Sequence, residues 1–266
     1  MTEEASRLER GAPEGRPLPF AAPCNLLPAG APLGWVRKGW QDYRRAPAQS
    51  LAYGAAIVAL SWVVTGIGLR VGSYWAVLVL LSGFVFVAPL LALGLYSISR
   101  QLERGAAPSM ATGLAEMLRS LGTLMVFALA LLVVFLVWAR AGSMVHVFFP
   151  VRSNPDLGQL ATFLAIGSAV GSIFACITFL FSAFSLPMIC DRDTDAITAI
   201  VTSVNAVLRN KPAMAVWAAL IVGLTALGFA TALFGLAVAI PVLGYATWHG
   251  YRETVDAGAW PSHGAG

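Results

Sequence analysis

Acidic residues are concentrated directly after one of the long apolar runs of this chain. The stretch Asp191-Arg192-Asp193-Thr194-Asp195 has three carboxylates within five residues. Such a group is a possible divalent-cation site, but the stretch lacks the glycine and the distal Glu of a calcium-binding loop. A simpler interpretation is that Asp193 or Asp195 caps an amphipathic helix over residues 195–209, and that Arg192 pairs with a neighbouring acid.

Basic residues occur at the ends of other apolar runs. Arg100 and Arg104 lie one helical turn apart at the end of one run, and Arg209 and Lys211 precede another. These four are candidate contacts for lipid head groups or for a partner protein. The alternative is that Arg100 and Arg104 are topology anchors that also complement the helix dipole.

His249 lies in Tyr245-Ala246-Thr247-Trp248-His249-Gly250-Tyr251-Arg252, a composition typical of the membrane–water interface. With Asp191, Arg192 and Asp195 it forms a candidate interfacial polar cluster. A haem axial ligand would be placed within a span, usually with a second His. His146 is expected on the opposite side of the membrane, and His263 lies in the tail.

The motifs of familiar catalytic sites are absent from the sequence. It has no Ser-His-Asp order, no phosphate-binding Gly loop and no HExxH, and its three cysteines are far apart. We therefore predict no catalytic residues, no metal and no cofactor, and we expect the protein not to be an enzyme.

The elements that must position these residues are membrane spans. The chain is 58% apolar and only 11% charged. About 18 or more uncharged apolar residues suffice to cross the hydrocarbon core of a bilayer. Five runs without Asp, Glu, Lys or Arg meet this requirement: Ser50–Leu69, Val71–Ser99, Ser120–Ala139, Leu157–Cys190 and Ala213–Trp248.

The number of spans depends on the two longest runs. Ala213–Trp248 would overshoot the bilayer as one helix, so we predict two helices folded back near Gly228–Gly235. Leu157–Cys190 is expected to form one tilted helix. Six spans with cytoplasmic termini place eleven basic residues inside and three outside, in agreement with the positive-inside rule. The three outside are Arg70, Arg140 and Arg152.

The six spans pair into three hairpins, each preceded by an amphipathic segment. Apolar residues recur at helical spacing in each segment, as expected for a helix lying in the interface. Each hairpin ends near a proline, Pro89, Pro187 or Pro241, which kinks the helix or ends its membrane part. The apolar rows are Leu33, Val36, Trp40 and Tyr43; Met110, Leu114, Met117, Leu118 and Leu121; and Ile197, Ile200, Val201, Val204, Val207 and Leu208.

The predicted organisation is all-α: a polytopic inner-membrane helical bundle of six transmembrane helices over residues 31–254. Residues 1–30 are rich in Pro, Gly and charge, lack the apolar core of a signal peptide, and are predicted to be a disordered cytoplasmic tail. Residues 255–266 are expected to form a short flexible tail. Gly167 and Gly171 form a GxxxG pattern that suits close helix packing within the chain or in a homodimer.

Three stretches together resemble a family of bacterial inner-membrane proteins, domain-of-unknown-function family 2189. They are PLLALGLYSISRQLERGAAP (residues 89–108), DRDTDAITA (191–199) and PVLGYATWHGYR (241–252). The resemblance covers roughly residues 35–255 and implies a multi-pass helical protein without implying an activity. Members of the family often have His at the position of Tyr245. This chain lacks the resulting His pair, which argues against a metal or haem there.

Function is less constrained than architecture. We expect a non-enzymatic membrane protein that binds lipid, a small ligand or a protein partner, with no nucleic acid among its partners. Membrane lipids are the expected partners, together with a second copy of the chain or another membrane protein. The alternative is a transporter or channel for a neutral or weakly polar solute, because the spans have no ionisable residues for ion coupling.

Overall fold

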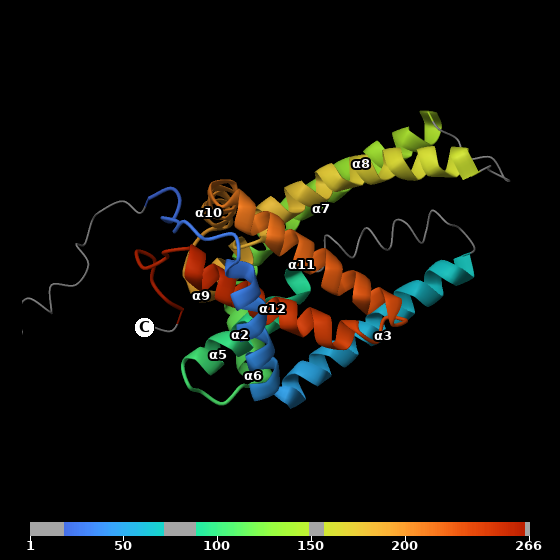
Figure 1. Ribbon diagram of the computed structural model, residues 1–266. Helices are drawn as coiled ribbons and strands as arrows, with labels where there is room; N and C mark the ends of the chain where they lie inside the picture. The colour runs from blue at the N-terminus through green and yellow to red at the C-terminus, as the bar shows by residue number, and fades with distance from the viewer. Residues whose placement is uncertain (1–18, 72–88, 149–156, 264–266) are drawn as a thin grey trace, which may run out of the picture.

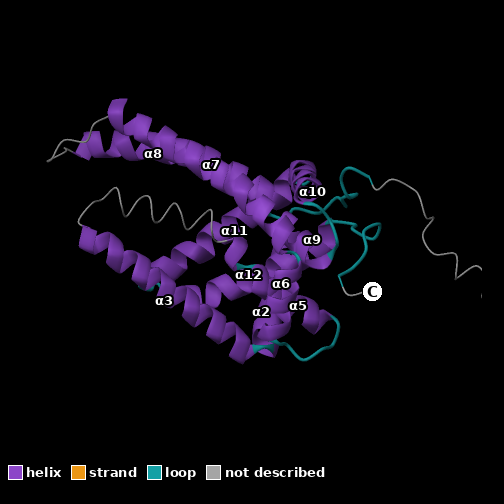
Figure 2. Cartoon of the chain, turned by 180° about the vertical axis from the view of Figure 1, so that it is seen from behind, coloured by secondary structure: helices purple, strands orange, loops and turns teal. Residues whose placement is uncertain are grey.

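The computed structural model describes residues 19–71, 89–148 and 157–263, and the regular structure in this part of the chain is helical (Figures 1 and 2). Only two isolated β-bridges occur there, Cys24–Val255 and Arg192–Ser262. The helices are α2 (Ala31–Arg45), α3 (Pro47–Val71), α5 (Leu93–Glu103), α6 (Met110–Arg119), α7 (Leu121–Phe148), α8 (Leu157–Ser182), α9 (Ser185–Asp191), α10 (Ala196–Arg209), α11 (Lys211–Ala230) and α12 (Leu236–Thr254).

Four segments of the described chain are long and apolar enough to cross a membrane, which makes this a multi-pass membrane protein. They are Pro47–Gly68, Leu121–Met144, Ala165–Asp191 and Lys211–Ala230. The spans α3, α7 and α8 extend away from a group of shorter helices, and α7 and α8 run side by side (Figures 1 and 2). Most of the second predicted span, Val71–Ser99, lies outside the described residues.

The predicted fold-back within Ala213–Trp248 is confirmed. Helix α11 ends at Ala230 and α12 begins at Leu236. Thr231 closes the turn, since its hydroxyl donates to Gly228 O (2.8 Å) and accepts from Gly235 N (2.7 Å). The turn also holds Ala232 and Leu233 at positive φ, 52° and 73°. Two residues in this left-handed conformation reverse the chain within a short turn.

The second half of this pair differs from the other spans. Helix α12 includes Pro241 and ends with His249, Arg252 and Glu253, so it is too polar to count among the four candidate spans. It packs instead against α2, α3, α5 and α11, and most of its residues are buried. The polar half of α12 is stable inside the protein because its side chains bond to neighbouring helices there.

The run Leu157–Cys190 was predicted as one helix and is divided into α8 and α9. The break falls at Ala183 and Phe184. Pro187 has no N–H to donate to Ala183 O, so the ladder of backbone bonds is interrupted at this point. Ser203 Oγ of α10 accepts from Phe184 N at 3.1 Å and satisfies one of the freed groups.

The three predicted amphipathic segments all form helices, α2, α6 and α10. Each of them buries one face and leaves most of the predicted apolar row at least partly exposed, although Val207 of the α10 row is buried. In α2 the buried residues are Pro32, Trp35, Gly39 and Asp42, while Leu33 and Trp40 are 59% and 44% exposed. Outward apolar rows are what a helix at the membrane interface requires.

Both ends of the described chain pack against the helices. Ala22 N donates to Thr202 Oγ1 (2.9 Å) and Asn25 N to Thr254 O (2.8 Å). The disordered tail predicted over residues 1–30 therefore does not include 19–30, and residues 1–18 lie outside the described part. The C-terminal tail also packs, because Trp260 is buried and Pro261 O accepts from Asp193 N (2.9 Å).

Two glycines let helices approach α12 at backbone distance. An added Cβ at Gly39 would lie 2.6 Å from Val242 O and 2.8 Å from Ala246 N, and one at Gly54 would overlap Ala237 O. By contrast, Gly167 and Gly171 of the GxxxG pattern have no atom within 4 Å of an added Cβ. This pattern does not serve a close helix contact within the described chain, and the homodimer remains a prediction.

We expect Gly39→Ala to lower stability by about 2 kcal/mol, because the new methyl group meets backbone atoms of α12 and cannot be accommodated by a side-chain rotation. Gly34 of the same helix provides a matched control, since an added Cβ there meets nothing within 4 Å. Gly34→Ala should be neutral or stabilising by up to about 1 kcal/mol. The measurement is the thermal unfolding midpoint of both variants in detergent, and equal midpoints would contradict the close approach of α2 to α12.

Candidate functional site

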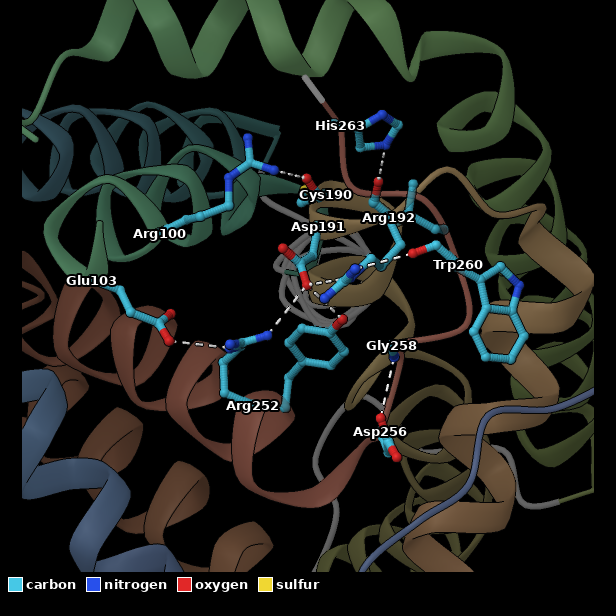
Figure 3. Close-up of polar contacts among 12 residues, drawn as sticks. Arg100, Glu103, Cys190, Asp191, Arg192, Arg252, Asp256, Gly258, Trp260 and His263 are labelled. Carbon is cyan, nitrogen blue, oxygen red and sulfur yellow. Dashed lines mark hydrogen bonds and ion pairs between the residues drawn. The ribbon is translucent and has the colours of Figure 1, made fainter. Parts of the chain in front are cut away.

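A polar cluster joins four helices at the end of the spans, and Figure 3 shows its contacts among α5, α9 and α12. It contains side chains from α5, α6, α9 and α12 and from the residues after α9, and all but Glu103 and Arg252 are buried or half-buried. The three stretches that resemble the family therefore meet in space, although they are separated by long apolar runs. The members are Ser97, Arg100, Glu103, Glu116, Cys190, Asp191, Arg192, Trp248, Tyr251 and Arg252.

Asp191 is the buried acid at the centre of the cluster, with only 4% of its surface exposed. Its Oδ2 accepts hydrogen bonds from Arg192 Nε and from the Tyr251 hydroxyl, both at 3.0 Å. Arg252 Nη1 lies 3.6 Å from the same oxygen. A buried carboxylate is stable only when cations and donors replace its lost hydration, and two arginines and a phenol do so here.

Arg252 extends the cluster from α12 to α5. Its Nε donates to Glu103 Oε1 at 3.2 Å, and the indole Nε1 of Trp248 donates to Glu103 Oε2 at 2.9 Å. Both partners of this ion pair are about two-fifths exposed. The pair itself therefore contributes little, and the buried indole bond is the more specific contact.

Arg100 is the buried cation of the cluster, with 2% of its surface exposed. One guanidinium nitrogen donates to Cys190 O, and another pairs with Glu116 of α6. Ser97 Oγ donates to Glu116 Oε2 at 2.6 Å. These contacts fix α5 to α6 on one side and to α9 on the other, and Glu116 compensates a charge that water does not reach.

His249 belongs to a second polar group on the opposite side of α5. Its Nε2 lies 2.7 Å from Asp42 Oδ2, and Ser99 Oγ donates to the same oxygen at 2.6 Å. Asp42 is 3% exposed. Asp42 of α2 lies four residues before Ala46, which joins α2 to α3, and Glu116 of α6 lies four residues before Ser120, which joins α6 to α7. Each accepts from a serine of α5, as expected if the two segments are repeats.

Burial, together with the negative charge of Asp191 and the hydrogen bond to it, raises the pKa of the Tyr251 phenol. The phenol is thus the donor in its bond to Asp191. For Asp195, partial burial opposes the shift, but hydrogen bonds from Thr198 and neighbouring backbone groups lower the pKa. Its carboxylate accepts from Thr198 N at 2.9 Å, which confirms Asp195 as the N-cap of α10.

The predicted site residues fall into three places. Asp191 and Arg192 contact each other, as the sequence indicated, whereas His249 bonds to Asp42 and Asp195 caps α10. Arg100 lies inside the protein, so it is not a surface contact for lipid. Arg104, Arg209 and Lys211 are exposed, and their contact with head groups or a partner stays a prediction.

Sequence reasoning missed the residues that complete the cluster. Asp42 and Glu116 face inward from α2 and α6, on the side opposite the apolar row. Their position on that side of the helix is the feature of the sequence that could have identified them. Glu103 and Tyr251 had no signal, since their partners are distant in the chain. Within the described residues no three His, Cys, Asp or Glu side chains lie close enough to hold a metal ion. The geometry supports cross-linking of helices by compensated charges.

Spans joined at one end by a compensated polar cluster define a multi-pass integral membrane protein. Residues 76–191 match the model of a family described as "Predicted integral membrane protein (DUF2189)". The match confirms the family that the sequence resembled. It includes Arg100, Glu116 and Asp191 but not α12. None of the curated proteins or solved structures compared with the chain matches it.

The cap at Asp195 makes a pH-dependent contribution to stability. Asp195→Ala should cost about 1 kcal/mol at neutral pH, and Asp195→Asn much less, because Asn also caps helices. The folded pKa is lowered, so the contribution is present above the ordinary carboxyl pKa and is lost as pH falls through the folded value. Thermal midpoints should therefore separate wild type from Asp195→Ala at pH 7 and converge below about pH 4. A pH-independent difference would contradict the ionic cap.

Proposed function

We propose that this protein is a non-enzymatic protein of the bacterial inner membrane that binds anionic lipid at its cytoplasmic face. In this proposal its six spans form three hairpins and both termini lie in the cytoplasm. The observation that carries the proposal is that α2, α6 and α10 each expose large apolar side chains beside exposed basic residues.

The repeated junctions support a common position for these three helices. Each amphipathic helix ends in an exposed arginine, followed by one buried residue and then a span. The arginines are Arg45, Arg119 and Arg209, and the buried residues are Ala46, Ser120 and Asn210. Because α3, α7 and α11 all begin at these junctions, the basic residues gather at one end of the spans, as the positive-inside rule requires.

Charge at the opposite end is sparse, which supports the proposed orientation. Among the described residues, Arg70 and Arg140 are the basic side chains near the far ends of α3 and α7. Acidic lipid at the cytoplasmic surface attracts nearby Lys and Arg by about 1 kcal/mol for each residue. The exposed Arg104, Arg209 and Lys211 are suitable for this contact, since Arg104 and Arg209 each end or follow a helix at this end and Lys211 starts a span.

Replacement of Arg104, Arg209 and Lys211 by Gln should weaken retention of anionic lipid. The loss is up to about 3 kcal/mol, or on the order of 100-fold in the binding constant, if each residue contributes fully. The measurement is native mass spectrometry of protein released into mild detergent with phosphatidylglycerol added. Arg70→Gln/Arg140→Gln is the matched control and should retain lipid as wild type does. Equal retention by both variants would reject the proposal and favour a test of neutral-solute flux.

The proposed topology predicts which introduced cysteines react from each side of the membrane. Gly105→Cys and Ala259→Cys should be labelled by an impermeant maleimide only from the cytoplasmic side, and Arg70→Cys and Arg140→Cys only from outside. All four positions are exposed in the structure. The protein without an added cysteine serves as the blank. Labelling of residue 259 from outside would indicate five spans instead of six.

A further inference from the structure

Helix α6 is the least enclosed of the three amphipathic helices. Gly113 is its only buried residue, and its main packing partner is α5. The row formed by Met110, Leu114 and Leu118 is 44%, 53% and 56% exposed. An apolar row of this kind beside a polar cluster requires a covering surface.

The surroundings of α6 identify the covering surface as an acidic bilayer. The row continues along the chain into Leu121, Met125 and Leu129 of the span α7, which are 46%, 62% and 59% exposed. Exposed side chains of a span face acyl chains, so the row of α6 adjoins the lipid-facing surface. Arg104 and Arg119, which flank α6, are exposed and basic, and the exposed carboxylate of Glu103 is paired with Arg252, so the free charge beside α6 complements anionic head groups.

The inner side of α6 carries the counter-charge of a buried cation. Glu116 pairs with Arg100 and accepts from Ser97, while the other end of the Arg100 guanidinium donates to Cys190 O of α9. Glu116 is the carboxylate within ion-pair distance of Arg100 among the described residues. Displacement of α6 would leave Arg100 buried and uncompensated, which strongly disfavours the packed arrangement of α5.

We propose that α6 lies at the boundary between head groups and acyl chains of an acidic bilayer, and that this contact holds Glu116 over Arg100. The proposal rests on the proposed lipid-binding function and adds a regulatory element to it. Contact between α6 and the membrane then stabilises the polar cluster, and loss of that contact loosens α5 and its link to α9. Contact of α6 with the bilayer thereby changes how firmly α5 and α9, which hold the spans together, pack against each other.

Photocrosslinking tests the position of α6 in the intact chain. A diazirine amino acid at position 114 should yield phospholipid adducts in vesicles of phosphatidylcholine and phosphatidylglycerol. The same residue at position 112, which is exposed on this helix but outside the row, should react mainly with water. Both positions are at the surface, so the folded protein tolerates the substitution. Equal lipid adducts at 112 and 114, or water adducts alone at 114, would overturn the proposed position.

Hydrogen exchange in the same vesicles tests the coupling to α5. In Leu114→Gln/Leu118→Gln we expect the amides of residues 97–103 to exchange at least about tenfold faster than in wild type. The matched control is Ile197→Gln/Leu208→Gln, which alters the outward row of α10 by the same chemistry and should leave residues 97–103 unchanged. Unchanged exchange in the α6 variant would overturn the coupling.

The two proposals can fail separately. If lipid retention depends on Arg104, Arg209 and Lys211 but position 114 gives no lipid adduct, the lipid-binding function stands and the role of α6 is rejected. If retention is independent of those basic residues while position 114 crosslinks to lipid, α6 lies in the membrane and the lipid-binding function is rejected.

Discussion

The compensation of buried charge at one end of the spans is the constraint on which the arrangement of the helices depends. Asp191 and Arg100 are 4% and 2% exposed, and neither is stable there without partners. Their partners come from α12, which lies beside α9 in space but not in sequence, and from α6, which follows α5 along the chain. The apolar spans are alike in composition, so the polar contacts at their ends specify which helices become neighbours.

Close backbone packing around α12 is the second determinant of the helix arrangement, besides the buried charges. Helix α12 contributes to both polar groups, through His249 towards Asp42 and Tyr251 towards Asp191, and His249 reaches Asp42 because α2 lies directly on α12. Gly39 permits this approach, and Gly54 permits that of α3. A small residue in one helix and a polar bond in the next therefore act together, as in other membrane bundles without a hydrophobic driving force between helices.

The sequence predicted well which segments form helices, and it predicted poorly which of their side chains face the interior. Long uncharged runs mark spans because the bilayer imposes their length, and the three apolar rows marked α2, α6 and α10. The break at Ala183 follows from the nearby Pro187, which the sequence marked as a kink or helix end. By contrast, the packed residues 19–30 and the buried polar half of α12 were not predictable, since each depends on partners distant in the chain. For the same reason Asp191 and Arg192 were recognised as a pair, while Asp42 and Glu116 were not.

Arg100 shows why position in the sequence is a limited guide to the role of a charged residue. At the end of an apolar run, one turn from the exposed Arg104, it has the features of a lipid contact, yet it is inside the protein. The difference arises from Glu116, whose helix covers Arg100 on one face and is bare of protein on the other. If the proposed contact of α6 with an acidic bilayer holds, the buried Arg100 is stabilised by protein and membrane together.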